Sequence, residues 1–267
     1  MHAESIPTNT NRRDPIFVLL HGAGLGPWIW DSLRKRLPFR SVALEVPSRK
    51  RGTDPARCAR EILGDPAFPA SQRVVLVLHS LAGVLEAPLA TALGARLAGV
   101  VHLASVVPDN GTSFAATIGW PNLLILRFLF WRHPDGLAPS PSMLRDQLCG
   151  DLDAEASLRV VESFQPEHPG LFLEPVPDRT TEPRRVYLVC AKDRSVPPGL
   201  QRRMARRMGA GSAELDCGHL PMLSHAELLA SLVVATARDL LKETAVAPDH
   251  REATTTDRAA EALAPAT

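Results

Sequence analysis

Short apolar runs alternate with amphipathic segments along most of this chain of 267 residues. Runs rich in Val, Leu and Ile predict strands buried on both faces, whereas apolar residues spaced three or four apart predict helices that cover a sheet. We expect strands at 16–20, 41–46, 74–78, 99–107, 185–190 and, more weakly, 212–216. Helices are expected at 28–37, 55–63, 81–93, 198–208 and 224–242. This alternation predicts an α/β fold with a doubly wound, mainly parallel sheet.

Two helix starts carry local signals. Asp54 followed by Pro55 is typical of an N-cap with proline in the first turn, and Gly64 is placed to end that helix. Ser224 and Glu227 have the spacing of a capping box, which predicts that the last helix opens there.

The alternation stops between residues 108 and 182, where proline, aromatic residues and a helical stretch near 141–164 replace it. We interpret 108–182 as a helical lid inserted into a core formed by 14–107 and 183–243. The ends of the chain are polar or rich in Ala, Thr and Pro, a composition that predicts disordered arms at 1–13 and 244–267.

Composition excludes several classes of protein. The chain is 45% hydrophobic and 22% charged with a net charge of +1, which fits a globular domain without a nucleic-acid footprint. Its four cysteines show no paired spacing, so we expect neither a disulfide framework nor a zinc site, and no cofactor. The polar N-terminus lacks the apolar core of a signal peptide, which predicts a cytoplasmic protein. The most apolar segment, Trp120 to Trp131, is too short to span a bilayer.

Ser80 is the candidate nucleophile. It follows the apolar run 74–78 directly and precedes small residues, the setting in which a serine is mounted on a sharp turn between strand and helix. The usual pattern is G-x-S-x-G; here Ala82 holds one glycine position and the bulky Leu78 the other. Taken alone this motif is weak.

Two further residues complete a candidate triad. A serine hydroxyl needs a base, and the base needs a third group to hold it in one tautomer. Asp193 follows the predicted strand 185–190, and His219 follows the strand at 212–216. In a parallel sheet both would lie at the same edge as Ser80.

A glycine-bearing loop, His21-Gly22-Ala23-Gly24, follows the first predicted strand. Such a loop can turn its N–H groups toward a nucleophile. We expect the backbone N–H groups of Ala23 and Leu81 to form an oxyanion hole.

With these motifs the chain resembles the α/β-hydrolases, and more narrowly the esterase and hydroxynitrile-lyase branch that includes plant methyl-ester hydrolases. The resemblance covers about residues 15–242. It is carried by FVLLHGAGLGPWIWDSL at 17–33, VLVLHSLAGVLEAPLA at 75–90, VVPDNGTSF at 106–114, LVCAKDRSVPP at 188–198 and CGHLPMLSHAELLA at 217–230. It implies that Ser80, Asp193 and His219 are the triad. Asp109, just after an earlier strand, is the alternative acid, because some members of the family place the acid there.

The resemblance also helps to choose within the branch. Hydroxynitrile lyases typically carry a threonine after the loop histidine and a lysine near the catalytic histidine; here those positions are Gly22 and Leu220. This favours a serine hydrolase that cleaves a small carboxylic ester. A lyase or other non-hydrolytic enzyme using the same triad, and a small-molecule-binding protein on a hydrolase scaffold, remain alternatives.

The predicted lid concentrates aromatic residues: Phe114, Trp120, Phe128, Phe130 and Trp131. An apolar lid over Ser80 would select apolar or aromatic ester groups, so we take Trp120, Phe128 and Trp131 as candidates for the substrate pocket. The expected partner is this small-molecule ester. The sequence leaves the oligomeric state open, a homodimer included.

Overall fold

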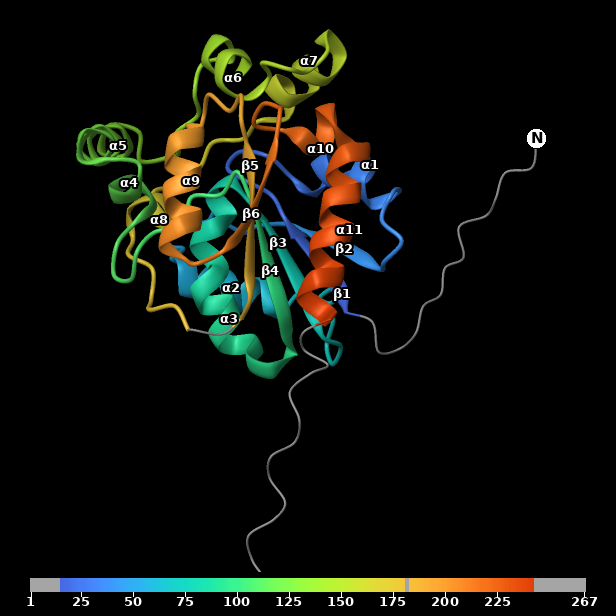
Figure 1. The fold of residues 1–267 in the computed structure, drawn as a ribbon. Coiled ribbons are helices and arrows are strands. Elements are labelled where there is room, and N and C mark those ends of the chain that lie inside the picture. The colour runs from blue at the N-terminus through green and yellow to red at the C-terminus, as the bar shows by residue number, and fades with distance from the viewer. Residues whose placement is uncertain (1–14, 181–182, 243–267) are drawn as a thin grey trace, which may run out of the picture.

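The centre of the molecule is a sheet of six parallel strands in the order β2-β1-β3-β4-β5-β6. The computed structural model describes residues 15–180 and 183–242, and the predicted arms at 1–13 and 244–267 lie outside them. The strands are β1 (Ile16–Leu20), β2 (Ser41–Leu44), β3 (Val74–His79), β4 (Leu97–Leu103), β5 (Arg185–Cys190) and β6 (Gly211–Leu215). The predicted fold class, a mainly parallel sheet flanked by helices, is confirmed (Figure 1).

Helices cover both faces of the sheet (Figure 1). One face packs against α1 (Asp31–Arg34), α10 (Pro221–Ser224) and α11 (Ala226–Lys242). The other packs against α2 (Pro55–Leu63), α3 (Glu86–Leu93) and α9 (Pro198–Arg207). Successive strand residues point to opposite faces, so Phe17 and Val77 join the first core and Val18 and Leu76 the second. The central strands are buried on both sides, which is why they are almost entirely apolar.

Several predicted boundaries differ from the structure, three of them for clear local reasons. β4 ends at Leu103, short of the predicted 107, because Ala104 adopts a φ of 47°, which extended pairing does not allow. The predicted helix at 28–37 is a 3₁₀ turn (Pro27–Trp30) followed by the single-turn α1. The predicted helix at 81–93 likewise opens as a 3₁₀ segment (Ser80–Leu85) before α3 begins.

The two helix-start signals had different outcomes. The Asp54 side chain accepts a hydrogen bond from the N–H of Arg57, Pro55 lies in the first turn, and α2 ends at Gly64, as predicted. The capping box at Ser224 was wrong. The Ser224 hydroxyl donates to Asp151 at 2.9 Å, and α11 begins only at Ala226. The Ser224 hydroxyl, which local spacing predicted to cap the helix, therefore donates to the distant carboxylate of Asp151 instead.

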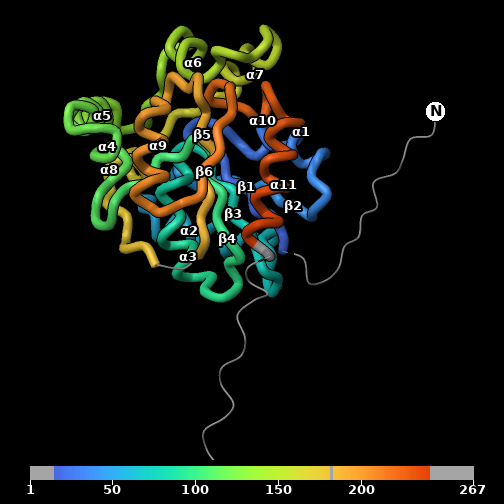
Figure 2. The backbone as a smooth tube through the Cα atoms, viewed as in Figure 1, coloured from blue at the N-terminus to red at the C-terminus, as the bar shows by residue number. Residues whose placement is uncertain are grey.

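The segment between β4 and β5 forms helices beside and above the sheet. They are α4 (Phe114–Thr117), α5 (Trp120–Arg132), α6 (Pro141–Leu148), α7 (Ala154–Ser163) and α8 (Gly170–Leu173). α6 and α7 lie over the carboxyl ends of the strands, while α4, α5 and α8 lie to one side (Figures 1 and 2). The helical stretch expected near 141–164 is two helices, because Asp153 caps a new helix by accepting from the N–H of Ala156.

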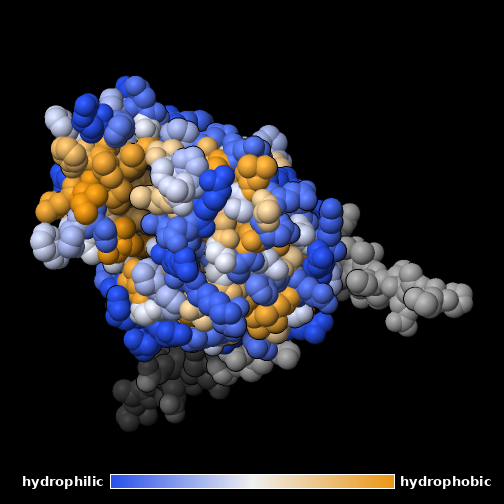
Figure 3. Space-filling view, turned by 90° about the horizontal axis from the view of Figure 1, so that it is seen from above, coloured by the Kyte–Doolittle hydropathy of each residue, from blue (hydrophilic) through white to orange (hydrophobic). Residues whose placement is uncertain are grey.

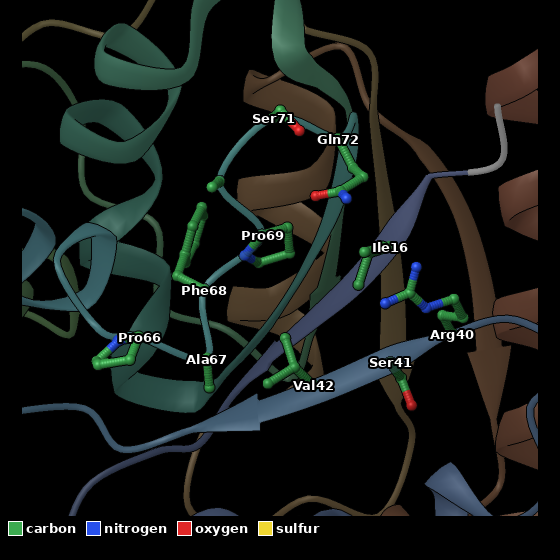
Figure 4. A pocket seen from close by; sticks show the side chains of 11 residues that line it. Ile16, Arg40, Ser41, Val42, Pro66, Ala67, Phe68, Pro69, Ser71 and Gln72 are labelled. Carbon is green, nitrogen blue, oxygen red and sulfur yellow. The ribbon is translucent and has the colours of Figure 1, made fainter. Parts of the chain in front are cut away.

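Two hollows lie at opposite ends of the strands. The smaller, of about 340 Å³, is at the amino ends of β1 and β2, where Ile16, Arg40, Val42 and Gln72 help to line it (Figure 4). The larger lies at the carboxyl ends, below α6, and contains Ser80. Among the helices in 15–180 and 183–242, none combines the length and apolar character needed to cross a bilayer.

Candidate active site

Ser80 stands on a tight turn at the end of β3. Its φ is 52°, in the left-handed region that costs a non-glycine residue roughly 1–2 kcal/mol. The helix that follows packs closely on the chain after β4: a Cβ at Gly83 would lie 2.4 Å from the carbonyl oxygen of Val106. Leu78, which replaces the usual glycine of the motif, is fully buried in the core between the sheet and α2 and α3. The turn therefore forms with glycine at 83 and without one at 78.

The loop after β1 lies against Ser80. A Cβ at Gly22 would be 2.7 Å from Ser80 Cβ and 3.2 Å from Ser80 Oγ, so glycine leaves the room that the hydroxyl needs. His21 Nε2 accepts from the N–H of Val46 at 3.0 Å, and its Nδ1 lies 2.8 Å from the carbonyl oxygen of Gly22. These contacts place the ring proton on Nδ1 and anchor the loop. Because the strand order reverses between β1 and β3, both loops open into one crevice.

The structure brings Ser80, His219 and Asp193 together. His219 Nε2 lies 3.0 Å from Ser80 Oγ, and His219 Nδ1 lies 2.8 Å from Asp193 Oδ2. All three residues are buried, with exposed fractions of 8%, 3% and 4% for Ser80, His219 and Asp193. In this arrangement Nδ1–H donates to the carboxylate and Nε2 accepts the hydroxyl proton, which is the geometry of an activated serine.

Asp193 is held by its own turn and by α9. Its Oδ1 accepts from the N–H groups of Ser195 and Val196 at 2.8 and 2.9 Å. Its Oδ2 accepts from Gln201 Nε2 at 2.9 Å, and Gln201 is fully buried. The alternative acid, Asp109, lies elsewhere: it is half-exposed and pairs with Arg207 at 2.6 Å. The contact to His219 therefore belongs to Asp193.

Gln201 and His79 also hold the site, and neither was predicted from the sequence. Gln201 carries a signal, since it is an amide on the apolar face of a short helix that begins five residues after Asp193. His79 lies between Leu78 and Ser80, and its Nε2 is 3.0 Å from the carbonyl oxygen of His219. Burial holds the pKa of His79 well below its ordinary value, so the neutral ring donates through Nε2–H and fixes the backbone of His219.

A cavity of about 570 Å³ opens above Ser80. Ser80, His219, Ala23 and Leu81 all line it, so both residues predicted to supply oxyanion-hole N–H groups border the same cavity as Ser80. Its walls are mainly apolar and come largely from the segment between β4 and β5: Phe114, Ile118, Ile125, Leu126, Leu129, Phe130, Met143, Leu144, Leu148, Phe164 and Phe172. A few polar groups interrupt them, namely Asn122, Ser140, Gln147, Glu167 and Ser195.

Trp120, Phe128 and Trp131, the predicted pocket residues, lie outside this lining. They are 73%, 60% and 75% exposed on the outer face of α5. A helix repeats every 3.6 residues, so positions 120, 128 and 131 share a face that points away from Leu129 and Phe130. Figure 3 shows hydrophobic side chains gathered on the side of the molecule where α5 lies. Of the five aromatic residues expected over Ser80, Phe114 and Phe130 line the cavity.

Comparison with known proteins identifies the family. Residues 17–232 match the model of the alpha/beta hydrolase family, so the chain belongs to that family. It is 26% identical over 263 residues to norfluorocurarine synthase 2 from a Strychnos species, covering 82% of this chain and 93% of that protein. It is 27% identical over 258 residues to salicylic acid-binding protein 2 from Nicotiana tabacum, covering 83% and 96%.

A solved structure shows the same fold. The crystal structure of a methylesterase from Arabidopsis superposes with a TM-score of 0.68 at 19% identity, covering 85% of this chain and all of that one. The resemblance to the α/β-hydrolases is thereby confirmed, and the methylesterase shares the fold of this chain.

Proposed function

We propose that this α/β-hydrolase is a serine esterase that cleaves small, apolar or aromatic carboxylic esters through an acyl-enzyme on Ser80. One observation carries the proposal: the Ser80–His219–Asp193 chain of 3.0 and 2.8 Å contacts lies at the floor of an apolar cavity. The family assignment supports hydrolysis, and the likeness to a methylesterase supports an ester as substrate.

In the proposed reaction the Ser80 oxygen attacks the ester carbonyl while His219 Nε2 takes the hydroxyl proton. Asp193 stabilises the imidazolium through Nδ1–H. The N–H groups of Ala23 and Leu81 receive the negative oxygen of the tetrahedral intermediate, where a single donor contributes about 10²- to 10³-fold to turnover. His219 then protonates the departing alcohol, and a water that His219 activates releases the acid and restores Ser80.

The segment 108–182 acts in this proposal as a lid that selects the substrate. Its side chains form most of the apolar wall above Ser80, and a volume of about 570 Å³ falls in the range of small-molecule sites. Apolar walls favour alkyl and aryl groups and keep bulk water from the acyl-enzyme.

The residues beside the triad favour an ester over a cyanohydrin. Gly22 offers no side chain to the cavity, and Leu220 is fully buried in the core beneath His219. Neither position can supply a cation or hydroxyl to a departing cyanide. Backbone N–H donors at Ala23 and Leu81 suit an ester's tetrahedral intermediate instead.

The test combines labelling with turnover. Purified protein should react with a fluorophosphonate at Ser80 and hydrolyse p-nitrophenyl acetate, and Ser80→Ala should lose both while keeping its unfolding temperature, because the hydroxyl is not a packing group. Mandelonitrile should release no cyanide above background. Cleavage of mandelonitrile without ester hydrolysis would establish the lyase, and tight binding of a small apolar ligand without either reaction would establish the binding protein.

A further inference from the structure

Two carboxylates of the segment between β4 and β5 reach down to the loops that carry the site. We propose that Asp151 and Glu167 are positioning residues, which hold the histidine loop (216–220) and the oxyanion loop (21–25) in their working geometry. The inference rests on the proposed esterase function. In this proposal the segment between β4 and β5 affects kcat as well as substrate selection.

Asp151 holds the residue before the proposed base. Its Oδ2 accepts from the N–H of Gly218 at 2.7 Å and from the Ser224 hydroxyl at 2.9 Å. A Cβ at Gly218 would lie 2.4 Å from Asp151 Oδ1, so only glycine lets the carboxylate approach this closely. The backbone beside His219 is therefore tied to the turn between α6 and α7.

Glu167 holds the oxyanion loop from the other side. Its Oε1 accepts from the N–H of Gly24 at 2.6 Å, and the N–H of Gln165 donates to the carbonyl oxygen of Gly24 at 2.9 Å. Glu167 is itself anchored, because its N–H and C=O both pair with Leu137 at 3.0 and 2.9 Å. The peptide groups on both sides of Gly24 are thus held next to Ala23.

Gly24 is shaped for this contact. Its φ of 68° lies in the left-handed region, and a Cβ there would meet the Phe164 ring at 2.1 Å. Glu167 is 2% exposed, and burial raises the pKa of its carboxyl despite the N–H of Gly24 and the charge of Arg49. Burying a carboxylate is unfavourable, and the hydrogen bond from Gly24 and the ion pair with Arg49 at 3.7 Å compensate part of that cost.

These contacts complete a set of restraints around the reacting groups. The His219 ring is held by Asp193, its carbonyl by His79, and the preceding N–H by Asp151. A displacement of about 1 Å in such a site lowers the rate about 100-fold. Loss of either lid carboxylate should therefore lower kcat. KM should stay nearly unchanged for Asp151 variants, because Asp151 lies outside the cavity lining, whereas Glu167 is one of its polar lining residues.

The histidine loop is tested first with Asp151→Ala. We expect kcat for a p-nitrophenyl ester to fall by about 10- to 100-fold, with KM within about twofold. Asp151→Asn keeps an oxygen for the N–H of Gly218 and should recover most of the loss. The matched control is Asp153→Ala, which removes a carboxylate two residues away that caps α7 and does not contact the loop.

A second variant approaches the same contact from the loop. Gly218→Ala should displace the Asp151 carboxylate and lower kcat by a similar factor. The double variant Asp151→Ala/Gly218→Ala should have a kcat no lower than that of either single variant. Without the carboxylate, the added methyl group at position 218 has room. This variant also keeps the inference testable if Asp151→Ala does not fold.

The oxyanion loop is tested with Glu167→Leu against Glu167→Gln, which retains an acceptor for the N–H of Gly24. Glu167→Leu should lower kcat by about 10- to 100-fold. It should weaken the binding of an aryl boronic acid, a mimic of the tetrahedral intermediate, by a similar factor. Glu167→Gln should stay within about fivefold of the wild type. The control is Glu162→Ala, an exposed position on α7.

The outcomes separate this inference from the proposed function. A wild-type protein that neither labels at Ser80 nor cleaves esters overturns the function itself. The positioning roles alone are overturned if the wild type is active and the Asp151 and Glu167 variants keep its kcat. The same holds if their kcat falls no further than that of the controls Asp153→Ala and Glu162→Ala.

Discussion

At the scale of single residues, Gly22 has no room for a side chain beside Ser80. Its Cα faces Ser80 directly, and a Cβ there would come within 2.7 Å of Ser80 Cβ and 3.1 Å of His79 Nδ1. A methyl group would have to push the nucleophile or the oxyanion loop aside. Gly22 thus leaves the space that Ser80 and His79 occupy in the candidate site.

We expect Gly22→Ala to lower kcat/KM for a p-nitrophenyl ester by about 100-fold or more, because the displacement acts on the attacking oxygen. The measurement is steady-state kinetics together with the rate of fluorophosphonate labelling. Gly150→Ala is the control, since a Cβ there meets nothing within 4 Å. Unchanged kinetics of the Gly22 variant would show that the loop relaxes freely and contributes little.

The proposed acid, Asp193, is tested at the same scale. Asp193→Asn should reduce kcat by roughly 10⁴-fold, because an amide cannot stabilise the imidazolium or hold its tautomer. Asp109→Asn should change kcat by less than twofold, since the half-exposed Asp109 carboxylate forms an ion pair with Arg207. The reverse ranking would move the acid to Asp109 and would contradict the contact seen at His219.

At the scale of elements, α5 has two apolar faces with different surroundings. The inner face, with Leu126, Leu129 and Phe130, lines the cavity, whereas Trp120 and Trp131 are exposed on the outer face. This explains why the helix was not predicted: apolar residues surround it, so the usual amphipathic period is absent. It also explains why Trp120, Phe128 and Trp131 were predicted to line the pocket although they lie on the outer face.

Neighbouring residues on α5 provide a matched pair. Leu129→Ala enlarges the cavity and should shift the preferred p-nitrophenyl ester toward longer acyl chains, changing relative kcat/KM by about 10-fold for one or two methylenes. Phe128→Ala, one position earlier and on the outer face, should leave the chain-length profile unaltered. Equal effects of the two variants would indicate that the helix rotates or that the cavity lies elsewhere.

At the scale of the whole molecule, a buried ionic cluster joins α3, β4 and β5. Glu86 is 1% exposed, its Oε1 accepts from Arg185 Nε, and His102 Nε2 lies 3.3 Å from its Oε2. Burial raises the pKa of Glu86, but His102 and Arg185 outweigh it and bring the pKa to about 2. The cluster lies inside the fold, so its ionisation affects stability rather than turnover.

The sign of the pH dependence follows from the lowered pKa. A glutamate in an unfolded chain has a pKa of about 4.3. The stability that Glu86 contributes is therefore present above that pH and is lost as the pH falls toward about 2. Glu86→Gln should be less stable than the wild type by about 3 kcal/mol at pH 7, because Arg185 loses a buried partner.

Chemical denaturation between pH 7 and pH 2 measures this difference. The gap in the free energy of unfolding should narrow below about pH 4.3, as the wild-type carboxyl becomes protonated. Asp135→Asn, which removes an exposed carboxylate, is the control and should show no such gap. A gap that stays constant down to pH 2 would show that the charge of Glu86 does not stabilise the fold.

The sequence by itself determined the sheet and the three residues that meet at Ser80. The strands are short, apolar and buried on both faces, so their pattern is local. Parallel strands end at one edge of a sheet, which means that Ser80, Asp193 and His219 could be placed together from their positions after strands alone. The motif at 21–24 could be found for the same reason.

Only the tertiary structure decided which side chains surround those residues. Asp151 lies 67 positions from Gly218, and Glu167 lies 143 positions from Gly24, so no local pattern joins either pair. Likewise, the spacing within α5 defines two faces but does not say which one meets the cavity. Strand ends are organised by the sheet's regular geometry, whereas contacts between loops and inserted helices depend on how distant parts of the chain pack.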